Sequence, residues 1–205
     1  VRWGNYNWSD KPLARDMSEA VGAEVRVVND ANAAAYGEAI YGAAKAYKNS
    51  IFITLGTGIG SGIIIDGKLF EGVRGAGAEA GHMVIQVGGV PCGCGRKGCF
   101  EQYASASALI RDTKRAMFEN KESIMWQMTG GDPENVDGKT AFAASREGDA
   151  AAQTVVKNYI VYLGEGILNL VSIFRPEAVI LGGGVCNEGE YLLAPLRKYV
   201  AERLY

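Results

Sequence analysis

Hydrophobic and polar positions alternate along the start of the chain in runs that predict a helix, a strand and a second helix. Residues Leu13–Val21 carry apolar side chains at helical spacing, and the β-branched segment 25–28 follows as a predicted strand. This strand ends at Asn29 and Asp30, and the alanine-rich segment 31–46 predicts a helix. Asp30 is therefore expected at a strand-to-helix junction, where polar groups face the usual ligand crevice of α/β sheets.

Strand patterns return in the middle of the chain, and a long glycine-rich loop follows them. The apolar segments 50–55 and 63–65 predict strands on either side of the glycine-rich segment 56–62. An Asp-Gly pair at 66–67 predicts a hairpin turn into a third strand. Residues 72–99 are loop-like and dense in glycine. A loop of that length needs an internal tie in order to be ordered.

Helical patterns dominate the rest of the chain. Segments 101–118 and 140–147 predict helices, and Asp149 is expected to cap a long amphipathic helix that ends before a proline. A buried strand, 178–181, runs into three glycines, and a final helix begins near Tyr191. The mixture of helices and strands predicts one α/β domain or lobe.

Composition limits the kind of ligand that the chain can take. Of its 205 residues, 48% are hydrophobic and 21% are charged, so a sizeable core can be buried. The net charge of -2 provides no electrostatic attraction for nucleic acid or for an anionic membrane. No apolar run approaches the roughly 20 residues of a membrane helix, and the first residues do not follow a signal-peptide pattern. Small-molecule ligands and a cytoplasmic location are expected.

Three cysteines and the chain's one histidine have the spacing of a metal site. Cys92, Cys94 and Cys99 lie on tight turns that the intervening glycines permit, and His82 is close enough to fold back as a fourth ligand. This set suits a tetrahedral zinc with no open position, hence a structural metal. The alternatives are unliganded reduced cysteines, or a zinc-ribbon nucleic-acid module, which the lack of basic charge and of a second ligand pair argues against. Cys186 is expected to be a small buried hydrophobic residue.

Two glycine-rich segments are candidates for binding phosphate or nucleotide. Glycines let backbone N–H groups approach an anion closely. The first segment fits neither the dinucleotide fingerprint nor the P-loop, because an apolar strand follows it where those motifs have a helix. The alternatives are a hairpin without a ligand and a simple turn. The candidate positions are Gly56, Thr57, Gly58, Gly60 and Gly62 in the first segment and Gly182, Gly183 and Gly184 in the second.

Carboxylates supply the remaining chemistry. Transfer of a phosphoryl group to an alcohol needs a carboxylate that accepts the hydroxyl proton, and Asp30, preceded by Asn29, is the best-placed candidate. A helix N-cap is the alternative role for Asp30. Glu79 and Glu101 lie on either side of the segment 82–99, called here the cysteine loop because it contains His82 and the three cysteines. A pair of carboxylates in these positions suits hydrogen bonding to sugar hydroxyls. Surface salt bridges are their alternative role.

These motifs together resemble the ROK family, which groups bacterial sugar kinases with sugar-responsive transcriptional repressors. The resemblance spans nearly the whole chain and looks closest to the family's glucokinases. The segments that carry it are Asn29-Asp30-Ala31-Asn32-Ala33-Ala34, Gly56-Thr57-Gly58-Ile59-Gly60, Glu79-Ala80-Gly81-His82 and Cys92-x-Cys94-Gly-x-x-Gly98-Cys99-x-Glu101.

The resemblance implies a fold and a set of roles. The fold would be the actin-like, ribonuclease-H-like ATPase fold, with residues 1–205 forming most of its C-terminal lobe. Asp30 would be the general base on the sugar 6-hydroxyl, and one ring nitrogen of His82 would bind zinc while the other faces the sugar. The first glycine segment would meet the ATP phosphates, the second the adenosine, and Mg²⁺ would arrive with the nucleotide. The sugar would be held by Asn29, Glu79, His82 and Glu101.

The resemblance also leaves alternatives open. The family's first phosphate loop, of the Asp-x-Gly-Gly-Thr type, would precede Val1, so the chain is expected to be a fragment with feeble kinase activity of its own. The leading function is phosphorylation of a hexose, most of all glucose, by a homodimer. The second is the sugar-sensing domain of a repressor, and the third a zinc-stabilised interaction module. The intact base and both glycine segments favour the kinase.

Overall fold

The described part of the chain's first unit consists of a short helix and a segment outside helices and strands. A computed structural model describes residues 11–205, which divide between a first unit that ends at Asp30 and a second unit, Ala31–Tyr205. Helix α1 (Leu13–Val21) has the predicted bounds. The predicted strand 25–28 is wrong, because these residues are in no strand and Val28 is 62% exposed. A strand requires a hydrogen-bonded neighbour, and residues 11–30 contain none.

The second helix is shorter than the alanine-rich pattern predicts. Helix α2 (Asp30–Tyr41) ends where the Glu38 carboxylate accepts a hydrogen bond from the N–H of Ala43 at 2.7 Å. The carbonyl oxygen of Glu38 accepts two further bonds, from the N–H groups of Gly42 and Ala44. A Cβ atom at Gly42 would lie 2.0 Å from the Glu38 carboxylate, so only glycine fits beside this local cap.

One four-stranded sheet organises the second unit, in the order β3-β2-β1-β4. Strands β1 and β2 form an antiparallel hairpin, β3 extends it through the predicted turn, and β4 runs parallel to β1. Strand β2 begins earlier than predicted and so includes Gly60 and Gly62. Strand β4 lies at an edge and is only half-buried, not fully buried as predicted. The bounds are β1 (Ser50–Leu55), β2 (Ile59–Ile65), β3 (Lys68–Leu69) and β4 (Ala178–Gly182).

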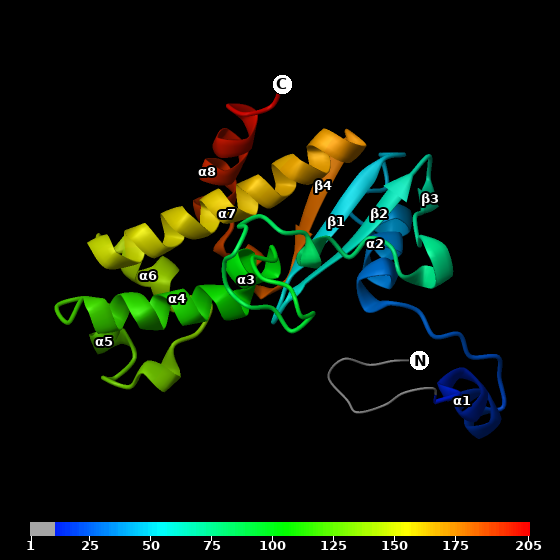
Figure 1. Cartoon of the computed structure of the whole chain (residues 1–205), viewed down its shortest axis with the longest axis horizontal. Helices are drawn as coiled ribbons and strands as arrows, with labels where there is room; N and C mark the ends of the chain where they lie inside the picture. The colour runs from blue at the N-terminus through cyan, green and yellow to red at the C-terminus, as the bar shows by residue number, and fades with distance from the viewer. Residues whose placement is uncertain (1–10) are drawn as a thin grey trace. The chain divides into compact units, whose positions relative to one another are not determined.

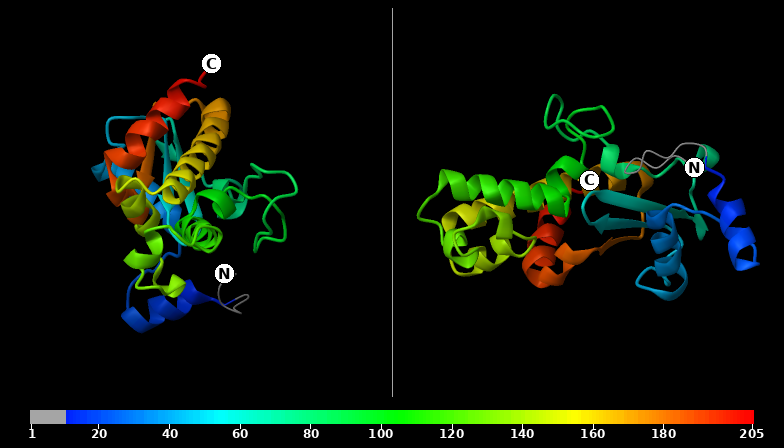
Figure 2. Two further views of the ribbon diagram at one scale, coloured as in Figure 1. Left: turned by 90° about the vertical axis from the view of Figure 1, so that its left-hand side faces the viewer. Right: turned by 90° about the horizontal axis from the view of Figure 1, so that it is seen from below.

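The two faces of the sheet carry different partners. On one face α2 packs so closely that a Cβ atom at Gly62 would lie 2.4 Å from the Cβ of Ala35. On the other face Ile51 and Ile53 join the main hydrophobic core, together with Phe100 and residues of the long helix α7 (Ala150–Phe174). Figure 2 shows the cysteine loop projecting on the side of the sheet opposite to α2. The glycines of β2 therefore have a packing role that the sequence pattern does not reveal.

Helices cover the core face and extend beyond it, with α4 and α7 side by side (Figure 1). The predicted helix 101–118 is interrupted at Ser105, whose hydroxyl accepts a hydrogen bond from the N–H of Ala108 at 3.1 Å and caps a new helix. No helix within residues 11–205 is long and apolar enough to cross a membrane. Besides α7, the helices are α3 (Glu101–Ala104), α4 (Ala106–Glu119), α5 (Met125–Met128), α6 (Thr140–Arg146) and α8 (Glu190–Ala201).

Asp149 caps α7 as predicted and also holds the residue before α5. Its carboxylate accepts hydrogen bonds from the N–H groups of Ala152 at 2.8 Å and Ile124 at 2.9 Å. Burial, which by itself raises the pKa of Asp149, is outweighed by these and neighbouring hydrogen bonds, so the pKa lies below its ordinary value. The ionised carboxylate therefore stabilises the folded state.

Replacing this cap should give a pH-dependent loss of stability. We expect Asp149→Ala to lower the free energy of unfolding by about 1–2 kcal/mol at neutral pH. Because the folded-state pKa is depressed, the contribution is present above the unfolded-state pKa and is lost as the pH falls through the folded-state value. The free energies of unfolding of Asp149→Ala and of the parent chain should therefore converge as the pH falls. Urea unfolding at neutral and at acidic pH measures both. Asp132→Ala, which removes the cap of only a three-residue turn, should lower the free energy of unfolding by less. If the difference in stability between Asp149→Ala and the parent chain does not depend on pH, the role assigned to the Asp149 carboxylate is wrong.

Candidate functional site

The predicted metal ligands converge in space. One ligand atom from each of His82, Cys92, Cys94 and Cys99 lies within 4.8 Å of all the others. The Sγ atoms of Cys94 and Cys99 are 3.6 Å apart, and the Nδ1 atom of His82 is 3.6 Å from the Sγ of Cys92. Three sulfurs and one imidazole nitrogen at these separations are the donor set of a closed, tetrahedral zinc site. The residues therefore fit the metal that the sequence predicts.

Backbone turns bring the thiols together without help from a large core. The N–H of Cys92 donates to the carbonyl of Arg96 at 2.9 Å, and the N–H of Gly95 donates back to the carbonyl of Cys92 at 3.0 Å. Gly95 and Gly98 have φ values of 88° and 82°, which L side chains rarely adopt. A Cβ atom at Gly98 would also lie 1.7 Å from the carbonyl oxygen of Gln86. The glycines of the motif are thus required by the turns.

The cluster's thiols differ in their surroundings. Burial raises the pKa of Cys92 to about 12 and also raises the pKa of Cys99, whereas a hydrogen bond from the Arg96 backbone lowers the pKa of the exposed Cys94. Zinc binds the thiolate form, so a metal entering the cluster must displace protons from the two buried thiols.

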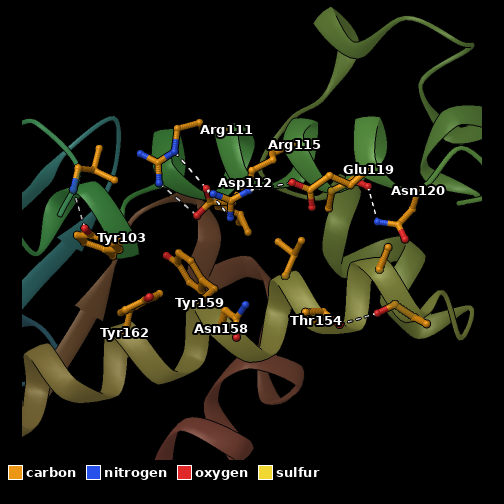
Figure 3. A pocket seen from close by; sticks show the side chains of 16 residues that line it. Tyr103, Arg111, Asp112, Arg115, Glu119, Asn120, Thr154, Asn158, Tyr159 and Tyr162 are labelled. Carbon is orange, nitrogen blue, oxygen red and sulfur yellow. Dashed lines mark hydrogen bonds and ion pairs between the residues drawn. The ribbon is translucent and has the colours of Figure 1, made fainter. Parts of the chain in front are cut away.

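Tyr103 fastens the cysteine loop to the helices. Its hydroxyl accepts a hydrogen bond from the N–H of Val90 at 2.7 Å, and its ring lies 4.7 Å from that of Tyr162 on α7. Figure 3 shows this contact at one end of the groove between α4 and α7. Tyr103 was not among the predicted site residues, and no local sequence motif marks it. It supplies part of the internal tie that so long a loop needs.

The groove in Figure 3, of about 520 Å³, is not where the predicted chemistry lies. Both of its arginines form ion pairs with Asp112, Arg111 at 3.1 Å and Arg115 at 3.4 Å. None of the predicted metal, glycine or carboxylate positions is among its lining residues. We therefore place the candidate site around the cysteine cluster.

Glu101 connects the cysteine cluster to the first glycine segment. Its Oε1 atom accepts a hydrogen bond from the Cys92 thiol at 3.0 Å and lies 3.8 Å from the Nδ1 of His82. A Cβ atom at Gly58 would lie 2.8 Å from the other carboxylate oxygen of Glu101. Glu79 immediately precedes the single turn Ala80–His82 and is exposed. Glu101 thus lies next to both the cluster and the hairpin at Gly58.

The two glycine segments lie next to each other at the carboxyl ends of two parallel strands. Thr54 of β1 pairs with Gly182 of β4, so the hairpin at Gly56–Gly58 and the turn at Gly183 follow at the same edge. A Cβ atom at Gly183 would lie 2.4 Å from the carbonyl oxygen of Leu55. This edge is where α/β sheets bind ligands. Gly60 and Gly62, by contrast, lie inside β2 beneath α2.

Asn29 and Asp30 close the first unit of the chain. Asp30 is the first residue of α2, as its predicted place near a helix N-terminus requires. The next residue, Ala31, packs against β2: a Cβ atom added at Gly60 would lie 2.9 Å from the Cβ of Ala31. The approach of Asn29 and Asp30 to the cluster stays a prediction.

The turn at Gly183 gives a direct test of the backbone at this edge. Gly183 has φ 98° and no room for a side chain, whereas adjacent Gly184 has open space around its Cα. We expect Gly183→Ala to lower the free energy of unfolding by about 2–3 kcal/mol. Gly184→Ala, the matched control, should change it by less than about 0.5 kcal/mol. Urea denaturation of both variants measures the difference, and equal effects would contradict the geometry.

Known proteins are similar to this chain over almost its whole length. The model of the ROK family matches residues 1–205. The glucokinase of Streptomyces coelicolor is 42% identical over 95% of this chain and 62% of its own length, and the xylose repressor of Bacillus subtilis is 35% identical over 98% of this chain and 48% of its own. The chain therefore spans less than two thirds of these relatives.

One solved structure is similar over almost the whole chain. It is the crystal structure of a ROK family glucokinase from Streptomyces griseus in complex with glucose and AMPPNP. Its sequence is 41% identical, the TM-score is 0.90, and the match covers 99% of this chain and 66% of that one. The predicted α/β, actin-like ATPase fold is thereby confirmed.

Proposed function

The chain belongs to the ROK family, and on that premise we propose that it serves the ATP-dependent phosphorylation of a hexose, with glucose as the favoured substrate. The observation that carries the proposal is Glu101, which touches both the cysteine–histidine cluster and the Gly58 hairpin. A sugar held by the first and a phosphate held by the second would be neighbours. The glucokinase from Streptomyces griseus, 41% identical, was crystallised with glucose and AMPPNP.

The sugar is held, in this proposal, by groups on both sides of the cluster. Asn29, Glu79, His82 and Glu101 hydrogen-bond to its hydroxyl groups, with His82 using the ring nitrogen that faces away from Cys92. Asp30 accepts the proton of the sugar 6-hydroxyl as that oxygen attacks the terminal phosphoryl group. His82 and the three cysteines would hold zinc, which would fix the loop that carries Glu79 and His82.

The nucleotide is held by backbone groups at the carboxyl ends of β1 and β4. N–H groups of Gly56, Thr57 and Gly58 contact the phosphates, which arrive with Mg²⁺, and the turn at Gly183 and Gly184 faces the adenosine. Gly60 and Gly62, which the sequence also suggested for phosphate binding, lie within β2. We assign them the close packing of α2 in place of a phosphate contact.

A sugar panel tests this function. The whole protein that carries this chain is assayed for ATP-dependent phosphorylation of glucose, fructose, allose, N-acetylglucosamine and N-acetylmannosamine, with direct binding of each sugar measured by calorimetry. We expect binding and turnover on glucose above the others. Turnover on none of the sugars would overturn the kinase, whatever the binding result.

The second candidate is the sugar-sensing domain of a repressor. It is favoured by the 35% identity to the xylose repressor of Bacillus subtilis over 98% of this chain. A sensor needs the sugar ligands but no general base. Sugar binding without turnover on any member of the panel would support this alternative over the kinase.

A further inference from the structure

The backbone immediately before Glu79 has an uncommon conformation. Ala78 has φ 61°, a left-handed conformation that is uncommon for a residue with a side chain. Glu79 follows with φ -82° and ψ 57°, and its carbonyl accepts a hydrogen bond from the N–H of His82 at 3.1 Å. A backbone held in this way is maintained only where its surroundings over-determine it.

One buried side chain binds the backbone on both sides of Glu79. The hydroxyl of Ser61 donates to the carbonyl oxygen of Ala78 and accepts a hydrogen bond from the N–H of Ala80 at 3.0 Å. Ser61 is 5% exposed and lies in the middle of β2, where it pairs with Ile53 of β1. Both peptide groups next to Glu79 are thus anchored to the sheet by a single oxygen atom.

The same strand holds the turn at a second point. Ile59, two residues before Ser61, lies against Gly81, where a Cβ atom would be 2.1 Å from the carbonyl oxygen of Ile59. Alternate residues of a strand face the same side of the sheet, so Ile59 and Ser61 contact the turn Ala80–His82 side by side along one edge of β2. The residues that contact this edge, Ala80 and Gly81, lie in sequence between Glu79 and His82, which we assign to the sugar.

From these contacts we infer that Ser61 is a positioning residue for sugar binding, which fixes the direction of the Glu79 carboxylate relative to His82. The inference rests on the proposed function, because it requires Glu79 to contact the sugar. Ser61 itself touches neither the sugar nor the metal cluster. Its effect is transmitted through two backbone hydrogen bonds, and displacement of a positioned ligand group by about 1 Å is enough to weaken binding substantially.

The test is Ser61→Ala in the whole protein that carries this chain. We expect the KM for glucose and the Kd for glucose to rise about 10–100-fold, as for other supporting hydrogen bonds around a binding site. The kcat should fall less than about threefold, and the KM for ATP and the zinc content should stay unchanged, because the glycine segments and the cluster keep their own ties. A role limited to stability would lower the melting temperature without moving the KM.

Ser145→Ala is the matched control. Ser145 is likewise buried, at 4% exposed, and its hydroxyl bonds the hydroxyl of Tyr191 at 2.8 Å, away from the turn. It should lose stability with an unchanged KM for glucose. In a Glu79→Gln background, Ser61→Ala should add less than about a twofold further loss, because both changes act through one carboxylate.

The outcomes separate the two claims. If the parent protein binds and phosphorylates glucose while Ser61→Ala has a KM within twofold of it, the positioning role is overturned and the proposed function stands. An equal rise in KM for Ser145→Ala, or a full additive loss in the Glu79→Gln background, overturns it as well. If the parent protein neither binds nor phosphorylates any sugar, the proposed function falls and this inference falls with it.

Discussion

Asp30→Asn should reduce the turnover of sugar phosphorylation by about 10²–10⁴-fold, the range that a positioned general base supplies. Asparagine keeps the size of the side chain, and loss of one negative charge from the first turn of α2 should cost only about 0.3–1 kcal/mol, so the helix should still form. Asparagine cannot accept the proton of the sugar hydroxyl. The Kd for glucose should change by only a few fold, since the amide still hydrogen-bonds to the sugar. Coupled kinetics and calorimetry on the same preparation measure both quantities.

Asp16→Asn provides the control for this substitution. Asp16 also lies in the first turn of a helix, α1, and it pairs with Arg15 at 3.0 Å on an exposed surface. Such pairs contribute little, so turnover and stability should be close to those of the parent protein. If Asp30→Asn retains more than about a tenth of the parent turnover, another group serves as the base and the assigned role of Asp30 is wrong.

Cys99→Ser should remove zinc from the protein and abolish sugar binding. Cys99 is fully buried, and its backbone forms an isolated β-bridge with Val84 at the base of the loop. Loss of its thiolate therefore opens the cluster at its least exposed ligand. A structural zinc contributes about 10 kcal/mol or more to the order of a small site. His82 and Glu101 depend on that loop for their positions, and we expect the affinity for glucose to fall more than about 100-fold. Metal analysis and calorimetry measure the two losses.

Cys186→Ser separates metal binding from a general effect of removing a thiol. Cys186 is outside the cluster and packs against the core near Leu196 and Val200. It should keep its zinc and its affinity for glucose. A chelator added to the parent protein should reproduce the phenotype of Cys99→Ser. Retention of zinc by Cys99→Ser, or loss of glucose binding that does not follow the metal, would show that the cluster is not what orders the loop.

The convergence of His82 with the three cysteines could be predicted because its information is local. Three ligands lie in one short segment and the fourth is close by, so ligand chemistry and glycine turns define the site with little contribution from the rest of the fold. The cap at Asp149 and the Asp66-Gly67 hairpin were predicted for the same reason. In each case the residues that make the contact are near neighbours in sequence.

The errors arose where distant segments decide the local structure. The segment 25–28 has strand composition but no neighbouring strand to pair with in residues 11–30. The predicted helix 101–118 is divided at Ser105, where the N–H of Ala106 donates to the carbonyl of the distant Gly56 at 2.9 Å. Gly60 and Gly62 resemble loop glycines until the close approach of α2 is seen. Ser61 and Tyr103 hold the loops of the candidate site. Tyr103 belongs to no motif, and Ser61 lies in the glycine-rich segment 56–62, whose pattern indicates phosphate binding and not this role. Their roles follow only from contacts made in three dimensions.

The parallel pairing of β1 with β4 also bears on the order in which this chain can fold. Ser50 pairs with Ala178, 128 positions later, whereas the β1–β2 hairpin closes over the three residues 56–58. Closing so large a loop has a high entropic cost and slows folding, so the hairpin and the cysteine loop can form well before β4 is added. On a ribosome the proposed sugar site would thus take shape before the sequence of the proposed nucleotide turn has been synthesised.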